Sequence, residues 1–135
     1  MRLAFADSFY FIALLSPRDR AREKAIELGK RVSGHFVTTD AVLLEVGDAV
    51  CAPRDRQRTA TYLRALWTHP RMKVYPVDRS LMDRGLALYE SRPDKEWSLT
   101  DCISFLVMEE EGIQEALTGD RHFEQAGFTI LFPGG

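Results

Sequence analysis

Short apolar runs alternate along this chain with segments in which apolar residues recur at helical spacing. The apolar runs predict buried strands at residues 3–6, 36–38, 73–77, 115–118 and 129–131. The intervening segments predict helices at residues 9–15, 19–32, 41–52, 56–68, 80–90 and 98–108, with a short helix through residues 123–126. Strands that alternate with helices are typical of a parallel sheet covered on both faces. We therefore expect a three-layer α/β fold in which helices flank a central, mostly parallel sheet.

The segment at residues 97–108 predicts the central helix of this fold. It begins with polar residues and becomes almost wholly apolar from Cys102 onward, which is typical of a buried helix. Ser98 or Thr100 can cap its start. Asp101 then lies in the first turn, where free N–H groups and the helix dipole favour a negative charge. Ser98 and Asp101 also have capping-box spacing, so a purely structural role for Asp101 stays open.

Three acidic residues lie where strands end or where the central helix begins. Asp7 follows the strand at residues 3–6, Asp120 follows the strand at residues 115–118, and Asp101 opens the central helix. In open parallel sheets, ligands bind outside the carboxyl ends of the strands. We therefore expect these carboxylates to converge at one edge of the sheet.

Glu45 is the fourth candidate, because it interrupts the apolar helix predicted at residues 41–52. A lone Glu is rarely buried without a partner. Its neighbours on the same helical face are Ala41, Asp48 and Ala49, and the two alanines leave space for a ligand. Asp48, one turn away, has two interpretations: support for the site, or a solvated helix face.

Carboxylates that are brought together repel one another unless a cation lies among them. Oxygen ligands select hard ions such as Mg²⁺ or Mn²⁺, and such ions bind phosphates and support phosphodiester hydrolysis. This chemistry needs no nucleophilic Ser, Cys or His, which agrees with the scattered positions of His35, His69 and His122.

Each acid also has a structural interpretation. Asp7 and Asp120 can cap the helices that follow them, and Glu45 can face solvent. Ser80 and Asp83 have capping-box spacing at the start of the helix at residues 80–90, and we assign Asp83 that role alone.

The length of 135 residues predicts one domain, at residues 1–132, with a flexible tail at residues 133–135. The net charge of −2 gives no bulk indication of a nucleic-acid partner, so a local basic patch would have to bind one. Cys51 and Cys102 have no zinc-ligand spacing and fit buried, reduced thiols in a cytoplasmic protein. We find no segment with the length of a membrane span.

Two arginine-rich stretches are candidates for contacting an RNA backbone, although solvated helix faces explain them equally well. The first contains Arg18, Arg20, Arg22 and Lys24, and the second contains Arg54, Arg56 and Arg58. Tyr10 and Trp97 are candidates for stacking on a base, with core packing as the alternative for Trp97.

The ordered motifs resemble those of the PIN-domain ribonucleases, and most closely the VapC-type toxins of bacterial toxin–antitoxin pairs. The matching pieces are Phe5-Ala6-Asp7-Ser8, Leu44-Glu45-Val46, Leu99-Thr100-Asp101-Cys102 and Leu117-Thr118-Gly119-Asp120-Arg121-His122-Phe123. The last piece is similar to the family's T-x-D-x-x-F segment. The resemblance extends over nearly the whole chain, and four acids in order are more specific than any single motif.

The resemblance implies a PIN-like fold and a metal-dependent endoribonuclease that uses Mg²⁺ or Mn²⁺. It implies an RNA substrate, a small antitoxin partner and a homodimer. The metal-binding catalytic acids would be Asp7, Glu45, Asp101 and Asp120, and Ser8 and Thr118 would be supporting polar residues. The chain departs from the family at Asp48, where a neutral polar residue such as Asn is common, and this affects only the charge expected at the site.

Two other functions are open from the sequence. One is a PIN-like module that binds RNA or protein without cleaving, which the presence of all four acids disfavours. The other is a phosphatase with an Asp nucleophile, which would need a second Asp at the position of Phe9.

Overall fold

The computed structural model describes residues 3–32 and 34–133 of the chain. Within them, one sheet contains β1 (Leu3–Ala6), β2 (His35–Thr39), β3 (Met72–Tyr75), β4 (Glu115–Leu117) and β5 (Thr129–Ile130). The strands have the order β3-β2-β1-β4-β5, and every neighbouring pair is parallel. The predicted α/β fold with a central parallel sheet is therefore confirmed. Residues 134 and 135 of the predicted flexible tail lie outside the described residues.

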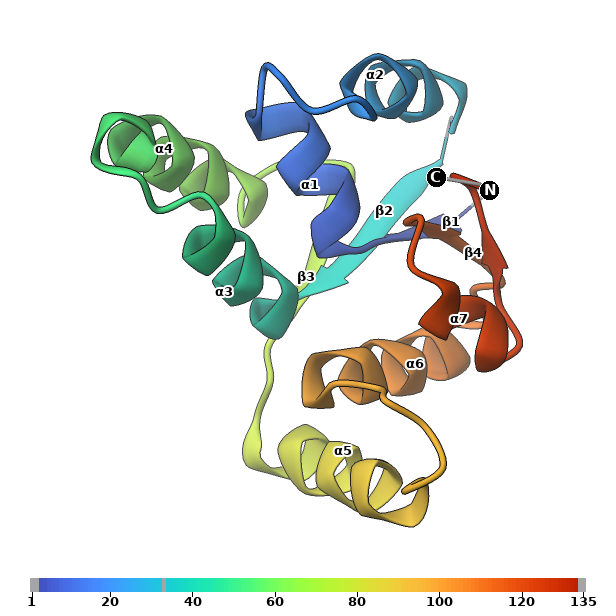
Figure 1. Ribbon diagram of the computed structural model, residues 1–135. Helices are drawn as coiled ribbons and strands as arrows, with labels where there is room; N and C mark the ends of the chain where they lie inside the picture. The colour runs from blue at the N-terminus through green and yellow to red at the C-terminus, as the bar shows by residue number, and fades with distance from the viewer. Residues whose placement is uncertain (1–2, 33, 134–135) are drawn as a thin grey trace.

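Helices cover both faces of this sheet, which gives the three expected layers (Figure 1). They are α1 (Ser8–Leu15), α2 (Arg22–Arg31), α3 (Asp40–Ala49), the short 3₁₀ helix η1 (Pro53–Asp55), α4 (Arg56–Leu66), α5 (Arg79–Ser91), α6 (Leu99–Glu111) and α7 (Arg121–Gln125). Figure 1 shows α1 and α2 on one side of the sheet and α5 and α6 on the other. No helix of the described residues is both long and apolar enough to cross a membrane.

Two predicted helix starts are wrong, because the side chains of Asp19 and Asp78 hold the chain in another way at these places. Helix α2 begins at Arg22 rather than at Asp19, since the Asp19 carboxylate accepts a hydrogen bond from the Ala21 N–H and holds a turn there. Helix α5 is capped by Asp78, which accepts from the Leu81 N–H at 2.8 Å, so Ser80 and Asp83 form no capping box.

Helix α6 is the buried central helix that the sequence predicts. Ser98 and Asp101 form the full capping box at its start, and Gly112, with a φ of 67°, ends it in the left-handed conformation that favours glycine. Phe105 of α6 packs edge-to-face on Phe123 of α7, with ring centroids 5.0 Å apart. This packing fixes α6 and α7 together beside the sheet.

The strand order places a topological switch point between β1 and β4. The chain moves outward from β1 through β2 to β3, and then crosses back so that β4 pairs with β1 on the other side. The connections that leave β1 and β4 therefore diverge, and ligands bind at such a switch point. The two peptide segments that follow these strands contain Asp7 and Asp120.

Candidate active site

Asp7 lies directly after β1 and is 4 % exposed. It occupies the N-cap position of α1, but its side chain makes no capping hydrogen bond. Its Oδ2 atom instead accepts a hydrogen bond from the Thr118 hydroxyl at 2.8 Å. The capping interpretation of Asp7 is therefore wrong for its side chain, and the carboxylate is turned toward the segment that follows β4.

Thr118 connects the segment that follows β1 with the segment that follows β4. Its hydroxyl donates to Asp7 and also accepts a hydrogen bond from the Asp120 N–H at 3.1 Å. Gly119 lies between them and packs closely on Phe9, since a Cβ atom at Gly119 would be 2.9 Å from the Phe9 ring. A residue without a side chain lets the segment run this close to α1.

Asp101 contributes a carboxylate from the first turn of α6. It is 7 % exposed, and its Oδ2 atom accepts hydrogen bonds from the Ser98 N–H at 3.1 Å. The same oxygen lies 3.0 Å from Nδ1 of His122. Asp101 therefore caps its helix and also takes part in the acidic site, so the two interpretations are compatible.

His122 brings Asp101 and Asp120 together. Its Nδ1 atom lies 3.4 Å from Oδ1 of Asp120, and that oxygen also accepts from the His122 N–H at 2.9 Å, which caps α7. Ligand atoms of Asp101, Asp120 and His122 all lie within 4.8 Å of one another. Sequence reasoning missed His122, although its position two residues after a candidate acid was an available signal.

Glu45 reaches the site through Ser8. The Ser8 hydroxyl donates to Oε1 of Glu45 at 2.6 Å, which links the first residue of α1 to the middle of α3. Glu45 is half-buried, whereas Asp48 is exposed. All four predicted acids and both predicted supporting residues, Ser8 and Thr118, thus lie in one region at the carboxyl ends of β1 and β4.

Burial dominates the electrostatics of this region. The pKa of Asp7 is raised from 3.8 to about 7, mainly by burial and to a smaller extent by the negative charges of Asp101 and Glu45, while the hydrogen bond from Thr118 lowers it. Burial is also the main cause that raises the pKa of Asp101, with the hydrogen bonds from Ser98 and His122 acting in the opposite direction. These carboxyl groups are therefore costly to ionise in the absence of a cation.

The donor set fits a divalent cation. Asp7 is buried, and no basic side chain of the described residues forms an ion pair with it, whereas buried charges are normally paired or bound to metal. Asp101 and Asp120 offer further carboxylate oxygens, and His122 adds an imidazole nitrogen to the oxygen-only set that the sequence suggested. Carboxylates suit Mg²⁺ and Mn²⁺, and a nitrogen ligand favours Mn²⁺ over Mg²⁺.

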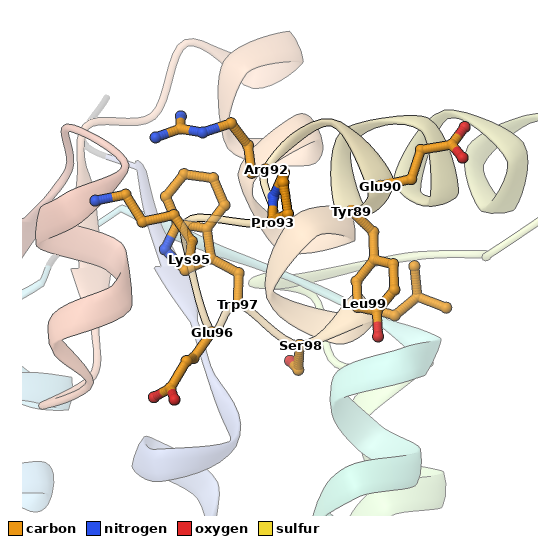
Figure 2. Close-up of a pocket in the computed structure, with 9 residues that line it drawn as sticks. All are labelled: Tyr89, Glu90, Arg92, Pro93, Lys95, Glu96, Trp97, Ser98 and Leu99. Carbon is orange, nitrogen blue, oxygen red and sulfur yellow. The ribbon is translucent and has the colours of Figure 1, made fainter.

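A pocket of about 710 Å³ lies at the loop between α5 and α6, the loop that leads to Asp101 (Figure 2). Trp97 and Ser98 lie on its wall, and the Arg92 guanidinium stacks over the Trp97 ring, 4.9 Å from its centroid. The Trp97 indole N–H donates to Gln125 at 3.0 Å. Trp97 and Tyr10 are both buried, which supports core packing as the role of their rings.

The arginines that the sequence suggests for RNA contact are dispersed in space. Arg18 and Arg54 line one pocket, whereas Arg20 lines another. Arg56 donates from Nε to the Cys51 carbonyl at 2.8 Å, and the Nε atom of Arg22 is buried without a hydrogen-bond partner among the described residues. A role in RNA binding stays a prediction for all five.

Comparison with known proteins agrees with this architecture. The PIN domain family model matches residues 4–129. The "23S rRNA-specific endonuclease VapC20" of Mycobacterium tuberculosis (strain CDC 1551 / Oshkosh) is 27 % identical over 131 residues, which cover 97 % of this chain and 99 % of that protein. The crystal structure of Mycobacterium tuberculosis VapC20, described as a Sarcin-Ricin loop cleaving toxin, superposes with a TM-score of 0.84 at 26 % identity, covering 93 % of this chain and 96 % of that one.

A more distant structure supports the fold alone. A toxin–antitoxin complex from Klebsiella pneumoniae contains a chain that superposes with a TM-score of 0.68 at 18 % identity, with 96 % of this chain and 97 % of that one covered. The family match spans nearly the whole sequence. The chain belongs to the PIN domain family.

Proposed function

We propose that this protein is a metal-dependent endoribonuclease and the toxin of a toxin–antitoxin pair. The observation that carries the proposal is the convergence of Asp7, Asp101 and Asp120 at the switch point of the sheet, with two of the carboxylates buried. The name of the M. tuberculosis relative, an rRNA-specific endonuclease, supports an RNA substrate.

In this proposal the four acids, with His122 beside them, hold Mg²⁺ or Mn²⁺. When bound, the ion neutralises the carboxylates, activates water and stabilises the charge that develops on the phosphate. The chain supplies the positioning: Thr118 orients Asp7, Ser8 orients Glu45, and the capping box fixes Asp101 at the start of α6. Rigid helix and strand ends hold these groups in place, which lowers the cost of orienting them during reaction.

Substitution of single acids tests the nuclease assignment. Asp7→Asn and Asp101→Asn should each lower the rate of RNA cleavage in Mn²⁺ or Mg²⁺ by at least ~100-fold, which corresponds to about 2.7 kcal/mol of transition-state stabilisation. Asp83→Asn is the matched control, because Asp83 is an exposed acid on α5 that pairs with Arg79. Cleavage by either site variant within a few-fold of the parent would overturn the assignment, as would full activity of the parent in EDTA.

Expression in cells tests the toxin assignment separately. The solved structures of similar fold include toxin–antitoxin complexes, which supports a small antitoxin as partner. The proposal also includes a homodimer and a cytoplasmic location. Expression of the protein alone should arrest growth, and co-expression with the product of an adjacent small open reading frame should restore it. Normal growth despite confirmed nuclease activity in vitro would leave a nuclease that is not a toxin.

A further inference from the structure

Three arginines from two distant parts of the sequence line one pocket at the far end of α1 from the acids. Arg18 follows α1, Arg54 lies in η1, and Arg58 lies in the first turn of α4. The pocket has a volume of about 470 Å³. Its charged lining residues are these three arginines and Asp55, which leaves an excess of two positive charges.

The three arginines have different degrees of freedom. Arg58 is fixed, because its Nη2 atom donates to the Leu15 carbonyl at 2.7 Å and lies 3.3 Å from Asp55. Arg54 is 88 % exposed and lies 3.9 Å from Asp55, at the limit of an ion pair. Arg18 is exposed and forms no ion pair with any described residue. Arg18 and Arg54 therefore keep most of their donors for a ligand, while Arg58 ties α4 to the end of α1.

Guanidinium groups that converge in this way match the oxygens of a phosphate. Each presents a planar set of donors that binds phosphate through two parallel hydrogen bonds. A protein partner is less well matched, because the hot spots of protein interfaces combine Arg with aromatic side chains such as Trp and Tyr, and no aromatic residue that the structure describes lines this pocket. The exposed large apolar residues of the described chain, Leu44, Trp67, Leu86 and Tyr89, all lie outside this pocket.

Helix α1 connects the pocket to the acidic site. Ser8 stands at its start beside Asp7, and Leu15 ends it at the pocket. The seven residue steps between them span about 10 Å. Ser8, Ile12 and Ser16 are each partly exposed and four residues apart, so they form one accessible stripe along this helix.

We infer that this arginine pocket is a phosphate-binding subsite for the RNA strand that enters the acidic site. The inference rests on the proposed function. Helix α1 spans about 10 Å between the two places, so the bound phosphate belongs to the same strand and lies a few nucleotides at most from the cleaved bond. The subsite raises the affinity for RNA that is long enough to reach it and leaves the affinity for shorter RNA unchanged.

The test replaces both free arginines and keeps the structural one. Arg18→Gln/Arg54→Gln removes two donors to phosphate, whereas Arg58 stays in place to hold α1 and α4 together. Steady-state cleavage is measured on a long RNA and on an oligonucleotide that ends within one nucleotide of the cut site. In the variant, the ratio of KM for the long RNA to KM for the short RNA should rise about 10-fold. The kcat on the long RNA should stay within about 3-fold of the parent value. The slope of log KM against log salt concentration should fall by about one unit.

Lys30→Gln/Arg31→Gln is the matched control. It also removes two positive charges, but from the last turn of α2. This turn leads to the start of β2, at the amino ends of the strands, whereas the acids lie at their carboxyl ends. The control should retain the KM ratio and the salt dependence of the parent. An equal change in the control would mean that overall charge, and not the pocket, is responsible, and would overturn the inference.

A binding measurement separates this inference from the nuclease assignment. Fluorescence anisotropy with labelled long RNA in EDTA reports binding without cleavage, and the Arg18/Arg54 variant should bind about 10-fold more weakly than the parent and the control. Failure of the parent to cleave any RNA would count against the proposed function alone. The subsite would be overturned if the variant bound RNA as tightly as the parent does. An equal fall in kcat on both substrates would also overturn it, as would loss of antitoxin binding with unchanged affinity for RNA.

Discussion

The Thr118 hydroxyl donates to Oδ2 of Asp7 across 2.8 Å and joins two residues that are 111 positions apart in the chain. The same hydroxyl accepts from the Asp120 N–H. One buried oxygen therefore sets the spacing between the segment after β1 and the segment after β4. Any change in this oxygen should disturb both sides of the acidic site.

Thr118→Val removes the hydroxyl and nearly keeps the shape of the side chain. It leaves the buried Asp7 carboxylate and the Asp120 N–H without this partner, so unfolding free energy should fall by about 1–3 kcal/mol. RNA cleavage should fall with it, because Asp7 loses its orientation. Thr118→Ser, which retains the hydroxyl, should recover most of both. Chemical unfolding and cleavage assays measure the two effects, and a valine variant as stable and as active as the parent would contradict this role.

Asp7 should make the stability of the metal-free protein depend on pH. Its pKa is about 7 in the folded state and about 3.8 when unfolded, so between these values the folded state binds a proton that the unfolded state does not. Stability should therefore fall as pH rises from about 4 through 7, by on the order of 4 kcal/mol from this group.

Asp7→Asn removes this titration and keeps an oxygen that can accept from Thr118. In EDTA, the variant should be more stable than the parent at about pH 8, and the difference should shrink toward about pH 5. Urea unfolding at both pH values measures it. A difference between variant and parent that is the same at both values would mean that Asp7 ionises normally in the folded protein.

His122 should influence which metal ion binds. An imidazole ligand strengthens binding of Mn²⁺ more than that of Mg²⁺. His122→Gln should therefore reduce the rise in melting temperature caused by Mn²⁺ and change the smaller rise caused by Mg²⁺ much less. His69→Gln, at an exposed position between α4 and β3, is the control. Equal losses for the two ions would assign His122 to positioning Asp101 and Asp120 instead of to metal binding.

Gly119 should tolerate no side chain while Phe9 keeps its place. Gly119→Ala puts a Cβ atom 2.9 Å from the Phe9 ring, which itself packs on Phe132 with centroids 5.0 Å apart. The substitution should cost about 1–3 kcal/mol of stability through overpacking. Adding Phe9→Leu should restore part of the loss, because the smaller side chain makes room. A double variant less stable than the sum of the two single changes would argue against the steric explanation.

The sequence was sufficient to predict the fold and the gathering of the four acids in one region, because both follow from local rules. Alternating apolar runs and helical segments lead to a parallel sheet, and the acids lie at its strand ends and helix starts. The sequence could not settle whether Asp101 and Asp120 cap helices or serve a site, because one carboxylate does both. In Asp101, the oxygen that accepts from the Ser98 N–H is also the one beside His122.

Other features depended on packing between distant segments. His122 enters the acidic site because Asp120 caps α7 and Phe123 is held in the core against Phe105, which fixes the direction of the preceding residue. The convergence of Arg18 with Arg54 depends on how α1 meets α4, and no local pattern encodes that contact. Two equally arginine-rich stretches therefore looked alike in sequence, although only some of their members share a pocket.

The position of β4 between β1 and β5 has a consequence for synthesis of the protein. Residues 115–122 supply β4, Thr118, Asp120 and His122, and they leave the ribosome after more than four-fifths of the chain has been made. Until then β1 lacks its second neighbour, and Asp7 and Asp101 have no partners from this segment. A growing chain therefore cannot bring these acids together, and the proposed nuclease site forms only when the protein is nearly complete.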